Sequence, residues 1–127
     1  VGADDVQIFT LNGRIIKTAG LTNNFEILRP LNDIYSSSEV YETINLYNPD
    51  LISSTIYRSM NSREATIKKL GRQIQVNRIE ESFDLDLIGW TGVNLYYRNT
   101  SSNQIESSEQ RIHPRLPIAK IEYYFKY

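Results

Sequence analysis

The chain has 127 residues, 40% of them hydrophobic and 11% aromatic, which suits one folded domain and is too short for two. Its 14 basic and 15 acidic residues give a net charge of −1, so no strong field recruits nucleic acid or a charged membrane surface. Cysteine is absent, which excludes disulfides, thiolate catalysis and cysteine-bound metals. No apolar run approaches the roughly 20 residues that span a bilayer. The chain starts at Val1 without an initiator methionine or signal sequence, so we expect a processed or trimmed chain.

The N-terminal part of the sequence predicts a β-hairpin followed by irregular structure. Residues 6–11 and 14–19 are two apolar runs that flank Asn12-Gly13, a dipeptide that tolerates the positive φ angles of a type I′ turn. Residues 20–33 are rich in Asn, Leu and Pro and predict irregular chain or a short helical turn.

Residues 40–47 have two interpretations. The serines at positions 36–38 and Glu39 are typical of a helix start, with serine capping and an early acidic residue. The segment itself alternates, with Val40, Glu42, Ile44 and Leu46 on one side, which favours a strand.

The middle of the chain predicts further strands. Residues 54–60 alternate in polarity, and residues 65–70 and 73–83 are separated by Gly71-Arg72. Within the last of these runs, Ile79 falls on the opposite parity from the earlier apolar residues, so we expect a bulge or a twist there.

The C-terminal part predicts three strands around a polar turn at residues 99–103. The first places Val93, Leu95 and Tyr97 on one face and Asn94, Tyr96 and Arg98 on the other. The second covers residues 104–112. The third covers residues 118–127, with Ala119, Ile121, Tyr123 and Phe125 on one face and Lys120, Glu122, Tyr124 and Lys126 on the other.

Together these elements predict an all-β fold with little helix. We expect residues 1–127 to form a single domain, an antiparallel meander of about seven to nine strands. Such a sheet must curl into a barrel, a half-barrel or a sandwich to protect its edges and bury one face.

The residues offer no catalytic site, metal site or cofactor site. His113, the only histidine, precedes Pro114 and suits a structural or surface position better than that of a general base. Asp84 and Asp86, preceded by Glu80-Glu81, would suit calcium or glycoside chemistry, but without a ligand loop they are more typical of a solvated strand edge. Glycine motifs for nucleotides and a basic aromatic face for nucleic acid are both absent.

Aromatic and amide side chains are the remaining lead. Trp90, Asn94, Tyr96 and Tyr124 are candidate contacts for a glycan or a partner protein, because aromatic rings stack on sugars while amides hydrogen-bond their hydroxyls. The alternative is that alternate rings only fill the core, as expected for Tyr97, Tyr123 and Phe125.

Two segments resemble a family of bacterial envelope lipoproteins encoded with exopolysaccharide and group 4 capsule genes, the YjbF/GfcB type. The first, residues 12–21, reads Asn-Gly-Arg-Ile-Ile-Lys-Thr-Ala-Gly-Leu and is similar to the hairpin of that family. The second comprises Trp90, Asn94 with Tyr96-Tyr97, Ser108-Glu109-Gln110 and Pro114. It departs from the family at Tyr97, where tryptophan is frequent, and at Asn99, where aspartate is common.

The resemblance implies the C-terminal part of a larger lipoprotein of the outer membrane, facing the periplasm. Its lipid-bearing cysteine would lie in an N-terminal part that these residues do not include. The implied role is non-catalytic assistance to polysaccharide production and secretion, with the polysaccharide or secretion proteins as partners. A half-barrel carrier of lipid or another hydrophobic ligand is the alternative. A glycan-modifying enzyme would need Asp84 and Asp86 together in a cleft.

Overall fold

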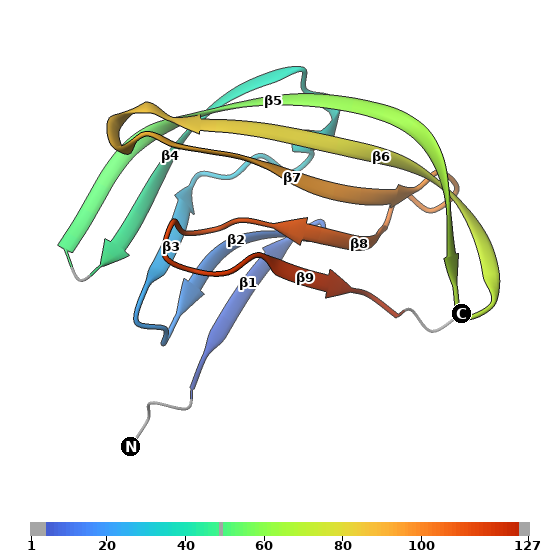
Figure 1. Ribbon diagram of the computed structural model, residues 1–127, viewed down its shortest axis with the longest axis horizontal. Helices are drawn as coiled ribbons and strands as arrows, with labels where there is room; N and C mark the ends of the chain where they lie inside the picture. The colour runs from blue at the N-terminus through green and yellow to red at the C-terminus, as the bar shows by residue number, and fades with distance from the viewer. Residues whose placement is uncertain (1–4, 49, 125–127) are drawn as a thin grey trace.

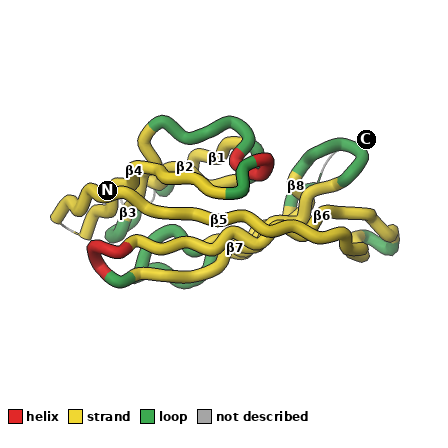
Figure 2. Tube along the Cα trace, turned by 90° about the horizontal axis from the view of Figure 1, so that it is seen from above, coloured by secondary structure: helices red, strands yellow, loops and turns green. Residues whose placement is uncertain are grey.

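The computed structural model describes residues 5–48 and 50–124, which form one nine-stranded antiparallel sheet (Figure 1). Each strand pairs with its neighbours in the sequence, in the order β1 to β9. The strands are β1 Gln7–Leu11, β2 Arg14–Ala19, β3 Asn24–Leu28, β4 Glu39–Asn48, β5 Asp50–Lys69, β6 Arg72–Leu85, β7 Trp90–Asn99, β8 Ile105–Gln110 and β9 Ala119–Glu122. The only helical segments in this described part are two 3₁₀ turns, Ile34–Ser36 and Asp86–Ile88 (Figure 2). The predicted all-β meander is therefore confirmed.

Two hairpin turns depend on residues with positive φ. Asn12 and Gly13 join β1 to β2 with φ of 50° and 78°, as the sequence predicts. Leu70 and Gly71 join β5 to β6 with φ of 51° and 76°, so this turn begins one residue before the predicted Gly71-Arg72 pair.

The sheet curls into a half-barrel whose two ends meet at a seam between β2 and β8. These strands lie side by side in Figure 1 although they are distant in the sequence. The side chain of Gln110 at the end of β8 bonds the backbone of β2, donating to the Gly13 carbonyl and accepting from the Ile15 amide, at 2.9 and 2.8 Å. The side-chain amide of Gln110 thus makes the donor and acceptor bonds that a backbone peptide group would make in a paired strand. It does so where β2 and β8 have no backbone pairing.

The long β5–β6 hairpin changes its buried side along its length. On β6 the buried residues pass from Val76 to Ile79, Glu81 and Phe83, which have the opposite parity. The pairing of β6 with β5 and with β7 stays in one register throughout. Of the two predicted alternatives at Ile79, the bulge is wrong and twisting of the ribbon accounts for the change.

The interior has two apolar clusters. The larger cluster is formed by side chains of β2, β3, β4, β5 and the last residues of β6, together with Ile112. The smaller cluster takes one side chain each from β6, β7 and β8. Their fully buried members are Ile15, Phe25, Ile27, Ile44, Leu46, Ile56, Phe83, Leu85 and Ile112 in the first, and Ile79, Tyr96 and Ile105 in the second.

One local prediction needs correction and another is confirmed. Residues 20–33 contain a strand, β3, where the Asn- and Pro-rich composition predicts irregular chain or a short helical turn. Residues 40–47 are strand, as their alternation favours, and they bury Val40, Ile44 and Leu46. The last strand has the predicted faces but ends at Glu122, and Phe125 lies outside the described residues.

The faces of β7 are reversed from the prediction. Asn94 and Tyr96 are 3% and 1% exposed, whereas Val93 is 39% exposed. Tyr96 is therefore a core residue and not a groove residue, while Tyr97 is only half-buried. The reversal has a physical cause: the polar side chains of β7 hydrogen-bond a carboxylate inside the half-barrel.

The close approach of the first turn to β8 gives a stability prediction. A Cβ added to Gly13 would lie 2.6 Å from the Cβ of Ile105, in addition to the cost of its positive φ. We expect Gly13→Ala to lower the free energy of unfolding by about 2 to 4 kcal/mol. Gly71→Ala is the matched control, because it has the same kind of φ but no atom within 4 Å, and should cost only about 1 kcal/mol. Urea unfolding followed by circular dichroism measures both, and equal losses would contradict the close approach.

Candidate functional site

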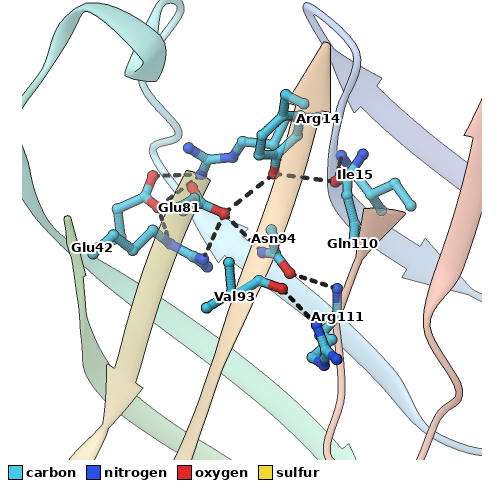
Figure 3. A network of polar contacts seen from close by, with 10 residues as sticks. Arg14, Ile15, Glu42, Glu81, Val93, Asn94, Gln110 and Arg111 are labelled. Atoms are coloured by element: carbon cyan, nitrogen blue, oxygen red, sulfur yellow. Dashed lines mark hydrogen bonds and ion pairs between the residues drawn. The ribbon is translucent and has the colours of Figure 1, made fainter. Parts of the chain in front are cut away.

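The most concentrated polar chemistry in the described residues lies inside the half-barrel (Figure 3). Four strands each supply one charged side chain to it. They are Arg14 of β2, Glu42 of β4, Arg58 of β5 and Glu81 of β6, all at most 6% exposed. We call these four residues the interior charge network.

Glu42 joins the two cations of the network. Both of its oxygens accept from Nη2 of Arg14, at 2.7 and 2.6 Å, and Oε1 also accepts from Nε of Arg58 at 2.9 Å. Nη1 of Arg58 then reaches Oε1 of Glu81 at 3.3 Å. Two cations and two carboxylates thus cancel, which is the condition under which buried charge is tolerated.

Amide and phenol groups add further hydrogen bonds to one oxygen of Glu81. Its Oε1 accepts from Nδ2 of Asn94 at 2.7 Å and from the Tyr96 hydroxyl at 3.2 Å. The Oδ1 atom of Asn94 accepts from the Arg111 backbone amide at 2.7 Å, which ties β7 to the segment after β8. Gln110 continues the chain of bonds to Ser108 and to β2. The network therefore connects the two sides of the seam.

Burial and nearby charge shift the pKa of three groups: Tyr96, Arg14 and His113. Burial raises the pKa of Tyr96 well above its usual value, and the nearby Glu81 carboxylate raises it further, so the hydroxyl stays a donor. Burial lowers the pKa of Arg14, but the charge and hydrogen bonds of Glu42 outweigh this and leave it raised. Burial also lowers the pKa of His113, whose Nδ1 accepts from the Arg115 amide at 3.1 Å, which suits the structural role expected for it.

The network is closed to substrates. The space among these side chains measures about 10 Å³, far less than a sugar ring or an acyl chain requires. Among residues 5–48 and 50–124, no group of three or more acidic or histidine side chains is placed to hold a metal ion. The arrangement stabilises the curled sheet and offers no route for a reactant.

The four candidate contact residues do not form one site. Asn94 and Tyr96 belong to the interior network, and Trp90 is half-buried against Phe83, with ring centroids 4.7 Å apart. Tyr124 alone is well exposed, at 62%, and lines an open groove near the tip of the β5–β6 hairpin.

The carboxylates at and after the end of β6 agree with expectation only in part. Asp84 in β6 and Asp86 in the following 3₁₀ turn are exposed, as predicted for a solvated edge, and lie in neither the network nor the groove. Glu81 is wholly buried, so the prediction was wrong for this residue.

Sequence reasoning missed the interior charge network, although a signal for it exists. Glu42 stands in the apolar register of β4, between Val40 and Ile44, and Arg58 follows Ile56 at the same parity in β5. A charged residue in the apolar half of an alternating strand indicates a buried ion that needs a partner.

These features define a class of protein: an all-β half-barrel domain with a closely packed polar interior. A family model described as "Group 4 capsule polysaccharide lipoprotein gfcB, YjbF" matches residues 1–123. The chain belongs to this family, as the resemblance of its two motif segments predicts. Membership of a lipoprotein family implies a membrane-anchored location in the cell envelope.

A solved structure has the same fold. The hypothetical lipoprotein YmcC from Escherichia coli K12 superposes with a TM-score of 0.74 at 22% sequence identity, over 87% of this chain. This chain covers 64% of that protein, which is less than two thirds of its length. A search of curated proteins gives no match. In the described residues, no helix has the length and apolar character needed to cross a membrane.

The interior charge network gives a second stability prediction. Glu81→Gln removes one of two balancing negative charges and leaves Arg58 underpaired, so we expect a loss of about 3 to 5 kcal/mol in the free energy of unfolding. The adjacent Glu80→Gln is the control, because that side chain is 41% exposed and pairs only with Arg78. It should change stability by less than about 0.5 kcal/mol. Similar values for both variants would show that the network does not hold the fold.

The seam gives a prediction that a local probe can read. Gln110→Leu leaves the buried Ile15 amide without its acceptor, so hydrogen exchange at Ile15 should become at least about tenfold faster. Gln104→Leu, in the exposed turn before β8, should leave that exchange rate unchanged. Unchanged protection of Ile15 in the Gln110 variant would contradict the seam.

Proposed function

We propose that this chain is a non-catalytic domain of an outer-membrane lipoprotein that faces the periplasm and assists capsule or exopolysaccharide production and secretion. It works by contact, with its surface meeting the polysaccharide or the secretion proteins. Membership of the capsule polysaccharide lipoprotein family supports a role in polysaccharide production. The geometry of the interior supports action by surface contact.

One observation carries the proposal: the polar residues of the family-like motif are used inside the fold. Asn94 bonds Glu81 and the Arg111 amide, and Gln110 bonds the backbone of β2. These side chains are committed to architecture, so they are not available to a reactant. Contact with other molecules then falls to the exposed outer surface.

The structure gives no support to the lipid-carrier alternative. A lipid-binding half-barrel needs an apolar cavity large enough for an acyl chain. Here the space at the centre is about 10 Å³ and is lined by Arg14, Arg58 and Glu81.

A genetic experiment tests the proposal. Deletion of the gene in the encoding strain should reduce surface polysaccharide severalfold, and re-expression of the whole protein should restore it. Sucrose-gradient fractionation should place the protein with the outer membrane. In-cell photo-crosslinking from Tyr124, the well-exposed member of the candidate contacts, should capture polysaccharide or secretion proteins, while the buried Ile56 serves as the negative position.

A second variant separates contact from catalysis. Asp84→Asn combined with Asp86→Asn should restore polysaccharide as well as the natural protein does, because both carboxylates lie on the exposed surface. Failure of this double variant would favour the glycan-modifying enzyme. Normal polysaccharide in the deletion strain would overturn the proposed function itself.

A further inference from the structure

An open groove of about 410 Å³ lies at the tip of the β5–β6 hairpin. We call it the tip groove. The hairpin bends at its far end toward the side of the molecule where β9 ends (Figure 1). The groove lies between the first residues of β6, the turn that follows β7, and Tyr124 after β9. Three segments that are distant in the sequence thus meet around one hollow.

The floor of the tip groove is a fixed polar array. Nζ of Lys69 lies 3.0 Å from Oε1 of Glu106, and Nδ2 of Asn99 donates to Oε2 of the same carboxylate at 3.1 Å. The Lys69 and Glu106 side chains are only 10% and 1% exposed. Lys69 also donates to the backbone carbonyl of Tyr123. The array holds the hairpin tip against the C-terminal strands, so the groove is pre-organised.

The walls of the groove carry an aromatic ring and two amides. The Tyr124 ring is 62% exposed and lies beside Lys69, with Nζ 4.9 Å from the ring centroid. Its hydroxyl donates to Glu122 at 2.6 Å, which fixes the orientation of the ring. From β6, Gln73 and Gln75 face the hollow, and Oε1 of Gln75 accepts from Thr66. That bond leaves the NH₂ group of Gln75 to donate to a ligand.

Cations and carboxylates both stand at the groove. Lys69, Arg72 and Glu106 line it, and Glu122 lies beside it, bonded to the Tyr124 hydroxyl. Because Glu106 is paired within the floor and Glu122 accepts from Tyr124, the cation left at the open rim is Arg72. In the described part of the chain, no carboxylate lies within ion-pair distance of this guanidinium. A planar guanidinium at an open rim can bind a carboxylate through two parallel hydrogen bonds.

We propose that the tip groove binds a short stretch of polysaccharide that carries a carboxylate, such as a uronic acid residue. The Tyr124 ring stacks on one face of a sugar, the amides of Gln73 and Gln75 bond its hydroxyls, and Arg72 pairs with the carboxylate. This inference rests on the proposed function and gives it a ligand class and a location. Of the four candidate contact residues predicted from the sequence, the proposed site keeps only Tyr124.

The outer face supplies a useful comparison. Tyr41 is 71% exposed, more than Tyr124, and stacks on Tyr57 with centroids 5.1 Å apart. Its neighbour Tyr57 donates to Glu39, as Tyr124 donates to Glu122, so each surface has a carboxylate beside its ring. The tip groove differs in having Lys69 against its ring and Arg72 at its rim. An acidic glycan should therefore prefer the tip groove over the outer face.

Calorimetric titration of the full chain tests the proposal with three probes. They are oligogalacturonate, the same oligomer with its carboxyl groups reduced to alcohols, and polysaccharide fragments from the encoding strain. We expect saturable binding of at least one acidic probe and at least about tenfold weaker binding of the reduced oligomer, because charged hydrogen bonds to Arg72 are lost.

Matched variants locate the binding. Tyr124→Ala and Arg72→Gln should each weaken acidic-probe binding about tenfold, because one loses the stacking ring and the other the cation. Tyr41→Ala and Arg63→Gln are the controls, since both remove the same residue types from exposed positions outside the groove. All four variants should keep the circular dichroism spectrum and urea midpoint of the natural chain.

Each result bears on the proposal. Equal affinity for acidic and reduced oligomers would overturn the ligand class. Unchanged affinity in the Tyr124 and Arg72 variants, or absence of saturable binding by every probe, would overturn the site. The gene-deletion experiment remains independent: if polysaccharide falls on deletion but the groove variants restore it fully, the groove proposal fails and the proposed function stands.

Discussion

Attraction between two buried guanidinium groups and two buried carboxylates is the constraint on which the rest of this half-barrel depends. Arg14, Glu42, Arg58 and Glu81 come from four different strands, so their contacts specify how those strands are placed. A shift of one residue in any strand would turn its charge to the opposite face and leave its partners unpaired in the interior. The network thus specifies register, whatever its net contribution to stability.

The amides of Asn94 and Gln110 extend this constraint to the edges of the sheet. Gln110 takes the place of a peptide group at the seam, and Asn94 anchors the segment that follows β8. The polar positions shared with the family are therefore explained by closure of the sheet. The tip groove lies away from Asn94 and Gln110, near the tip of the β5–β6 hairpin.

Much of the fold follows from local sequence patterns, but the choice of the inner face does not. Asn12-Gly13 and the alternation in β4, β5 and β9 predict hairpins and strands because turn geometry and side-chain period are local properties. Alternation on β7 correctly places Asn94 and Tyr96 on one face and Val93 and Leu95 on the other. Hydropathy then predicts that the face with Val93 and Leu95 is buried, whereas the buried face is the one with Asn94 and Tyr96. The buried Glu81, which needs hydrogen bonds, reverses the choice, and its partners come from distant strands.

The candidate site illustrates the same limit. Tyr124 was identified because it stands on the polar face of the last strand, and its exposure agrees with that reasoning. Arg72, Gln73 and Asn99 join it only because the β5–β6 hairpin bends and the β7–β8 turn folds beneath it. The spacing of these residues in the sequence does not predict that they lie close together.

The Gln110 seam has a consequence for the order in which the chain assembles. Every backbone pairing in the described sheet joins consecutive strands, so the ribbons can form from short loops at little entropic cost. The bond between Ile15 and Gln110 instead spans 95 positions, so it closes a far longer loop than any hairpin of the sheet does. Because a longer loop costs more entropy to close, we expect the ribbon to curl into a half-barrel after its hairpins have formed, and the seam to open before they do.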